Sequence, residues 1–310
     1  MILVTSLLSL TCIPTAYADG DQVVADDTAS LIANIAPDDG TIVPPDMGNS
    51  SAIVTTGDVS VTVPLDPDQP ITITDTQETA ASLPPVQVSL PAEIKVRPGH
   101  VGKNGTVVYP MTSKDGAHGA VQVMTDGSVR LETVMDSARS PHRFTYNLGG
   151  LTPVLQPDGS IELIQNLPSA SGSVQATVGS IQSAWAVDAT GNPVSTHYQV
   201  TGHGLVQVVS PDKQTTYPVV ADPQVSLTWS GLVVHFNRSE TNKLSIGGAY
   251  ATGVLGAAAV IPPAVVAISI FYGGWVAQAA YSYSVGKCLS ATLTFEGIWV
   301  PGSYSGGYCR

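Results

Sequence analysis

Residues 121–131 read VQVMTDGSVRL, and this stretch decides the kind of fold. On both sides of Asp126-Gly127 the apolar residues stand at every second position, which puts them on one face of an extended strand. Asp-Gly tolerates the positive φ that a tight hairpin turn requires. The stretch therefore predicts two antiparallel strands joined by a short turn.

The same turn chemistry recurs along the chain, at Asn104-Gly105, Asp158-Gly159 and Gly191-Asn192-Pro193. Alternating β-branched residues begin near Ala52, and short apolar runs follow at intervals of roughly 8–15 residues. Many short strands at this spacing are typical of an antiparallel sandwich. We therefore expect a β-sandwich domain over residues 52–223.

The segment Thr216–Pro223 reads TYPVVADP and marks the expected end of this domain. It resembles a recurrent YPVVADP element of uncharacterised secreted proteins from high-GC Gram-positive bacteria. The resemblance covers roughly residues 55–310. It implies a β module followed by an apolar, cysteine-closed C-terminal region, and it implies no active site.

The charge of the chain is low and unevenly placed. Charged residues make up 12% of the sequence, about half the ~25% usual for globular domains. No Lys or Arg precedes Lys95, whereas residues 1–94 contain 13 acids. Because a basic face is needed to displace counterions from phosphate, we expect no nucleic-acid partner. The phosphate-binding P-loop motif is also missing, so we expect no nucleotide.

The N-terminus has the pattern of a secretory signal. Residues 2–13 are apolar, and Ala16-Tyr17-Ala18 forms a small-x-small site after them. We expect a signal peptide over residues 1–18, cleaved between Ala18 and Asp19; the alternative is a buried N-terminal strand. Residues 19–51 are rich in Asp, Pro, Gly and Ser, so we expect an acidic disordered linker there.

Residues 244–286 contain no Asp, Glu, Lys, Arg or His. Pro262-Pro263 interrupts this run near its middle, which predicts an apolar helical hairpin over about residues 240–286. The hairpin belongs to an expected C-terminal domain over residues 224–310. Three interpretations stay open, because each apolar arm is marginal in length for a bilayer: a buried protein core, a membrane-inserting hairpin, or a permanent two-span anchor.

Two cysteines, Cys288 and Cys309, remain once the expected signal is removed. In an exported protein an even pair predicts one disulfide. The alternative is a metal or redox pair, which the spacing does not favour.

No familiar catalytic or metal-binding motif stands in the sequence, so we expect no catalytic, metal or cofactor-binding residues. One polar cluster adjoins the expected hairpin: His235, Arg238 and Glu240. It is open to two interpretations. The first is a recognition or pH-sensing site, because His titrates near neutrality. The second is a strand end and helix cap with one ion pair.

These observations lead to one expectation about function and two alternatives. We expect a β plus α protein that is secreted or associated with the cell envelope or membrane. We also expect that it is not an enzyme and that its C-terminal hairpin contacts a membrane or another envelope protein. The alternatives are a secreted membrane-active effector of bacteriocin or toxin type, and a hydrolase with an unrecognised site. The sequence leaves the oligomeric state open.

Overall fold

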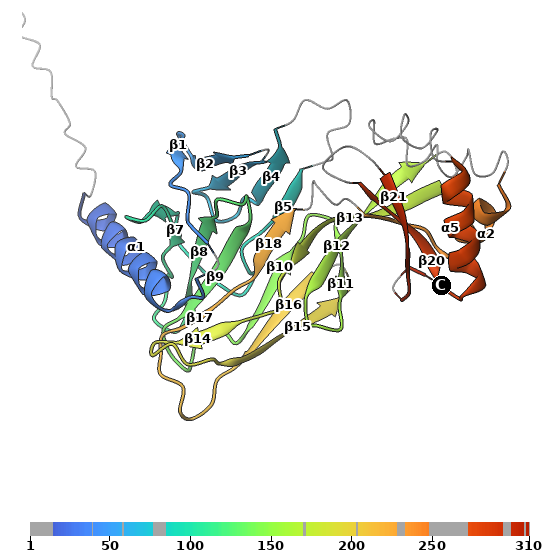
Figure 1. The fold of residues 1–310 in the computed structure, drawn as a ribbon. Helices are drawn as coiled ribbons and strands as arrows, with labels where there is room; N and C mark the ends of the chain where they lie inside the picture. Colours follow the sequence, from blue (N-terminus) through green and yellow to red (C-terminus); the bar gives the residue numbers. More distant parts are fainter. Residues whose placement is uncertain are drawn as a thin grey trace, which may run out of the picture.

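The fold is seen in a computed structural model (Figure 1). It describes residues 15–38, 40–57, 59–76, 85–169, 172–202, 204–227, 233–247, 272–293, 299–306 and 308–309. Within these ranges the chain is mostly β-strand, and every strand pairing is antiparallel. The helices of the described ranges are α1 (Thr15–Ile35), α2 (Arg238–Ile246) and α5 (Tyr272–Ser284).

The strands of these described ranges form three sheets. The first contains, in order, β1 (Asp46–Met47), β2 (Ser51–Thr56), β3 (Val59–Pro64), β4 (Ile71–Asp75) and β5 (Val86–Val88). The second has the order β10 (Arg143–Asn147), β16 (Gly204–Ser210) and β15 (Ser195–Thr201). The third, called the central sheet here, contains β6 (His100–Val101), β7 (Val107–Tyr109), β8 (Ala117–Val123), β9 (Val129–Met135), β11 (Thr152–Leu155), β12 (Ile161–Ser169), β13 (Gly172–Ile181), β14 (Ala186–Asp188), β17 (Val219–Ala221), β18 (Gln224–Leu227), β19 (Val233–His235), β20 (Cys288–Leu293) and β21 (Trp299–Tyr304).

The hairpin predicted over residues 121–131 is confirmed as the junction of β8 and β9. Val123 pairs with Val129, and the amide of Met124 donates to the carbonyl of Ser128 at 2.9 Å. Gly127 has φ +81°, and the Asp126 carboxylate accepts from the Ser128 amide at 2.9 Å. The turn chemistry read from the sequence therefore operates as expected.

The central sheet is covered on both faces. On one face, side chains such as Val121 and Leu131 share a core with Val61 and Ile71 of the first sheet. Successive residues of a strand point to opposite faces. Val108, Ala120, Val134 and Val220 accordingly lie on the other face, where α1 packs against them.

Helix α1 stands where a disordered linker was expected, and this corrects the interpretation of residues 19–51. Ala25, Ala29 and Ile32 are buried, and their spacing of four and three residues puts them on one helical face. Asp21 forms an ion pair with Arg97 at 2.7 Å on the sheet side. The segment has few large apolar residues, but a flat stripe of small ones suffices because the sheet supplies the other half of the core. The helix also runs through Ala18 and Asp19, so the proposed cleavage site lies in its first turns.

The described residues from 15 to 227 are called the main body. The YPVVADP element is an interior part of it. β17 pairs with β14 on one side and with β9 on the other, and all three of its residues are buried. β18 lies beyond the expected boundary at residue 223, yet it pairs with β9 through Gln224 and Val225. The central sheet therefore continues across this boundary.

The C-terminal lobe is defined here as residues 233–309, and it lies at the opposite end of the molecule from α1 (Figure 1). The long hairpin of β12 and β13 joins it to the main body: β13 pairs with β18 through Gly179–Ile181 and with β19 through Gln175–Thr177. β18 and β19 thus share an edge of β13. Most of the apolar hairpin expected over 240–286 lies outside the described residues, which show α2 and α5 near its two ends.

Candidate functional site

The polar cluster predicted from the sequence lies where β19 leads into α2, and it is built around a helix cap. Asn237 is the N-cap; its side chain accepts from the Glu240 amide at 2.9 Å, and its own amide donates to the Glu240 carboxylate at 2.7 Å. This reciprocal pair is a capping box. The cap falls at Asn237, which puts Glu240 at the third helical position, as a capping box requires.

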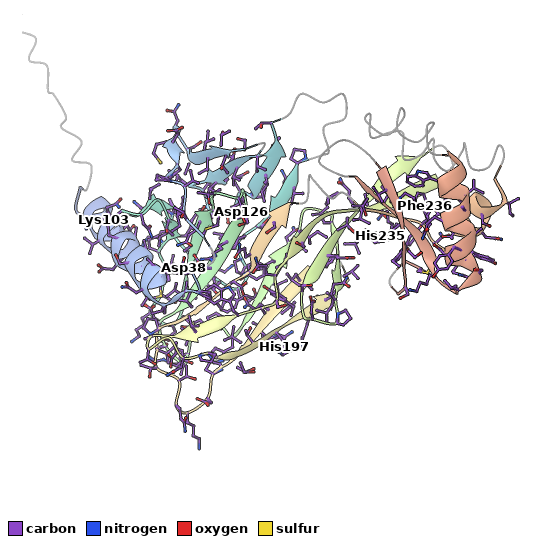
Figure 2. The ribbon with its side chains drawn as sticks, in the orientation of Figure 1. Asp38, Lys103, Asp126, His197, His235 and Phe236 are labelled. Carbon is purple, nitrogen blue, oxygen red and sulfur yellow. A yellow bond between two sulfur atoms is a disulfide. The ribbon has the colours of Figure 1, made fainter. Side chains whose placement is uncertain are left out.

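His235 ends β19, at the side of the C-terminal lobe that is nearest the main body (Figure 2). Its ring meets that of Tyr304 edge-on, with centroids 4.5 Å apart, and its Nε2 lies 3.0 Å from the hydroxyl oxygen of Thr177. Burial lowers the pKa of His235 to about 4. The ring is therefore neutral at neutral pH, which does not support pH sensing in that range.

Glu240 is shared between the cap and the C-terminal tail. Besides its bond to the Asn237 amide, its carboxylate accepts from the hydroxyl of Tyr308 at 3.3 Å. Burial raises the pKa of Glu240, and the hydrogen bonds from Asn237 and Tyr308 oppose that shift. Glu240 therefore fixes Tyr308 in place.

Arg238 points away from both partners of the predicted cluster. Its guanidinium donates to the carbonyls of Tyr283 and Lys287, at 3.1 and 2.8 Å, and lies over the Tyr283 ring. Cations near a helix C-terminus interact favourably with its unpaired carbonyls. The predicted cluster is therefore divided. Arg238 contacts the end of α5, whereas His235 contacts Tyr304 and Glu240 contacts Tyr308.

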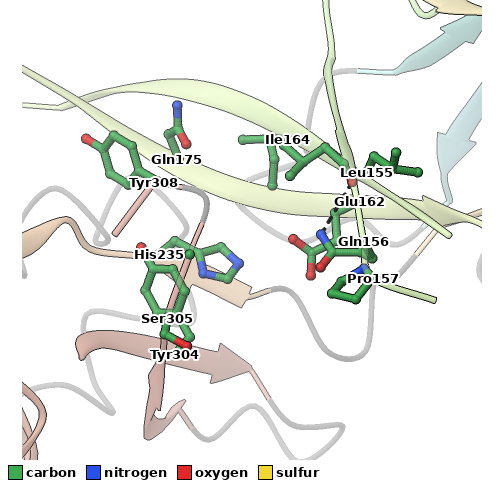
Figure 3. A pocket seen from close by; sticks show the side chains of 12 residues that line it. Leu155, Gln156, Pro157, Glu162, Ile164, Gln175, His235, Tyr304, Ser305 and Tyr308 are labelled. Atoms are coloured by element: carbon green, nitrogen blue, oxygen red, sulfur yellow. Dashed lines mark hydrogen bonds between the residues drawn. The ribbon is translucent and has the colours of Figure 1, made fainter. Parts of the chain in front are cut away.

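A pocket of about 380 Å³ lies on the His235 side (Figure 3). The turn between β11 and β12 forms one wall through Leu155, Gln156 and Pro157, and the C-terminal tail forms the other. The polar and aromatic side chains that line the pocket include Glu162, Gln175, His235, Tyr304 and Tyr308. The pocket therefore lies at the joint between the main body and the C-terminal lobe.

The tail wall is held by the predicted disulfide, which the structure confirms. Cys288, fully buried at the start of β20, is bonded to Cys309, with 5.5 Å between the Cα atoms. The Cys309 amide also donates to the Gly306 carbonyl at 3.0 Å. The β20–β21 pairing holds the chain before Ser305, and the covalent bond holds it after Tyr308. We therefore expect the shape of the pocket to depend on oxidised cysteines.

Sequence reasoning missed most of this pocket. Glu162 is the acid of an otherwise apolar strand, IELI at 161–164, and an isolated acid between β-branched and leucine residues was the available signal. Tyr304 and Tyr308 carry no such signal, because only the disulfide and the β20–β21 pairing bring them to His235.

A second polar group lies deep in the main body and was also missed. Glu132 and Asp222 are fully buried; burial raises the pKa of Glu132 to about 8 and that of Asp222 to about 7. Neither oxygen of the Glu132 carboxylate has a hydrogen-bond partner among the described residues. This group is closed to solvent, so we treat it as a determinant of stability.

Two further searches cover the described residues. They contain no group of three or more His, Cys, Asp and Glu side chains placed to hold a metal ion. Within the same ranges, no helix combines the length and apolar character needed to cross a membrane.

Comparisons with protein-family models, with curated proteins and with solved structures give no match to this chain. The resemblance to secreted YPVVADP proteins stays a prediction, and the function has to be argued from the molecule itself.

Proposed function

We propose that this chain is an exported, non-enzymatic protein of the envelope or extracellular space. In this proposal its C-terminal lobe presents the uncharged run 244–286 to a membrane or to an apolar surface of another envelope protein. We further propose that the main body is an antiparallel β-sandwich that carries this lobe, and that the apolar segment continues α2 and α5 as a helical hairpin.

The observation that carries the proposal is the antiparallel pairing of α2 and α5. Arg238, at the start of α2, contacts the carbonyls of Tyr283 and Lys287 at the end of α5. Leu244 and Trp275, nearer the other ends, are both buried in the common core. The end of α2 and the start of α5 therefore face the same side.

The composition of residues 248–271 and the exposure of Ile246 support an apolar contact. Residues 248–271 contain no charged side chain, and Ile246, at the end of α2, is 76% exposed. An apolar surface that a protein does not cover itself is typical of membrane or partner contact sites. The disulfide supports export, because such bonds persist in oxidising compartments.

The test is flotation of the purified oxidised protein with liposomes, beside carbonate and detergent fractionation of producing cells and their medium. Val265→Asp puts one charge into the uncharged run, and Val300→Asp puts the same charge on an exposed position of β21. We expect wild type and the Val300 variant to float and the Val265 variant to stay in solution. If all three stay in solution and the native protein fractionates as free monomer, the proposal is wrong.

Dye release from the same liposomes separates the proposal from the effector alternative. A surface module should bind vesicles and leave their contents sealed. Release of dye by wild type, lost in the Val265 variant, would instead assign the protein to the membrane-active class.

A further inference from the structure

The pocket beside His235 is not used by the function proposed above, and its lining is chemically selective. Of the described residues that line it, none is Lys or Arg, and Glu162 is the one carboxylic acid. A ligand with a phosphate or carboxylate group would meet an acid there and no cation. The lining therefore excludes anions and favours a neutral or positively charged ligand.

Among the described residues that line the pocket, Glu162 is the acid, and its carboxylate has no cationic partner. From the residues the structure describes, its carboxylate receives no hydrogen bond and no ion pair, although the side chain is only partly exposed. Burial raises its pKa, as expected for an acid that loses water without gaining a cation. A ligand that supplies positive charge would relieve this cost.

Two tyrosines, Tyr304 and Tyr308, line the pocket, and the hydroxyls of both are already engaged. The Tyr304 hydroxyl donates to the carbonyl of Phe236 at 3.0 Å. The Tyr308 hydroxyl donates to Glu240 at 3.3 Å and accepts from Asn237 at 3.2 Å. Aromatic rings beside a carboxylate are the usual surroundings of bound ammonium groups, since the ring faces attract cations.

His235 completes this wall without adding a charge. Its Nε2 is occupied by Thr177 and its ring is packed against Tyr304. The Nδ1 atom is buried and has no partner among the described residues. A neutral imidazole does not repel a cation.

We propose that this pocket binds the ammonium group of a small organic cation. Glu162 is the counter-ion, Tyr304 and Tyr308 are the aromatic walls, and the Cys288–Cys309 bond holds the tail in the binding position. This binding site does not depend on the proposed membrane contact, and either proposal can be wrong without the other.

The test uses choline as the cation and 3,3-dimethylbutan-1-ol, its uncharged isostere, as the matched control ligand. Binding to the full oxidised protein is measured by ligand-observed NMR and titration calorimetry. We expect saturable choline binding, with the isostere at least about tenfold weaker, because only choline pairs with Glu162. Equal affinity for the two ligands, or no saturable choline binding at about 20 mM, would overturn the proposal.

Three variants locate the site. Glu162→Gln should weaken choline binding at least about tenfold and leave binding of the isostere unchanged. Asp68→Asn removes one exposed charge that does not line the pocket, and it should change the affinity for neither ligand. Tyr308→Leu should weaken choline while Tyr308→Phe retains it, because the ring and not the hydroxyl makes the contact. Full choline affinity in both the Glu162 and the Tyr308→Leu variants would place binding elsewhere and refute the assignment.

Discussion

Arg238 lies over the ring of Tyr283, with its guanidinium carbon 4.1 Å from the ring centroid, and it donates to the carbonyl of the same residue. One side chain thus joins the first turn of α2 to the last turn of α5. The contact orients the two helices that bracket the uncharged run, so it links the fold of the C-terminal lobe to its proposed role.

The first prediction concerns this contact. Arg238→Met removes two charge-assisted hydrogen bonds and the stacking, and we expect a loss of about 1 kcal/mol in unfolding free energy, moderated by partial exposure. Arg143→Met is the control, because Arg143 is exposed and has one side-chain bond, to Gln199. Denaturant titration measures both. Equal stability of the two variants would show that the Arg238 contact contributes nothing.

The second prediction tests how α1 docks on the sheet. A Cβ at Gly102 would lie 2.8 Å from the Cβ of Ala29 and 3.1 Å from the carbonyl oxygen of Ala25. Gly102→Ala should therefore push α1 from the sheet and expose residues 20–37 to proteases. Gly20→Ala, in α1 itself with open space around it, should leave protection intact or improve it. Limited proteolysis with mass spectrometry gives the outcome; rapid cleavage there in wild type would contradict a docked helix.

The third prediction concerns the disulfide. The bond joins residues 21 apart, and the chain-entropy model assigns a loop of this size about 3 kcal/mol. Cys309→Ser should lower unfolding free energy by about that amount. Wild type treated with reductant should have the same unfolding free energy as the variant, because both lack the bond. Both thiols of the wild type should resist alkylation until reductant is added, and labelling without it would show that the bond is absent.

The fourth prediction is a pH dependence with a defined sign. Burial raises the pKa of Glu132 to about 8, from an ordinary value of 4.5. The folded state therefore holds a proton that the unfolded chain releases, and Glu132 costs stability progressively as pH rises from about 4.5 to 8. Glu132→Gln removes the titration, so its gain over wild type should be larger at pH 9 than at pH 5 in thermal melts.

Asp188 supplies the matched contrast. Hydrogen bonds from Thr190, Thr216 and Asn192 lower its pKa to about 2, with that from the Thr190 hydroxyl the largest cause. Its contribution is present above the unfolded pKa near 3.8 and disappears as pH falls toward 2. Asp188→Asn should therefore lose stability at pH 7 and approach wild type in acid. The same pH slope for both variants would mean that neither carboxylate behaves as its surroundings indicate.

Local features were readable from the sequence because their causes are local. Asp126-Gly127 and Asp158-Gly159 form the predicted turns, since the carboxylate bonds to an amide two residues later and glycine accepts positive φ. Cys288 and Cys309 pair as parity indicated. The antiparallel β character followed from the same alternation of apolar and polar residues.

Contacts between distant segments decided the rest. Ala25, Ala29 and Ile32 make a stripe too small to fold alone, and only the apolar face around Val108 and Val220 makes it a helix.

Arg238 was predicted beside His235, but its guanidinium donates to the carbonyls of Tyr283, in the last turn of α5, and of Lys287, just beyond that helix. Glu162 and Tyr308 line one pocket because the position of β12 and the disulfide at Cys309 bring both segments to it. The sequence by itself determined turns, strand character and the cysteine pair, since these depend on neighbours along the chain. The tertiary structure alone decided the helix cover, the buried acids and the pocket, because their energies arise only when remote surfaces lose water together.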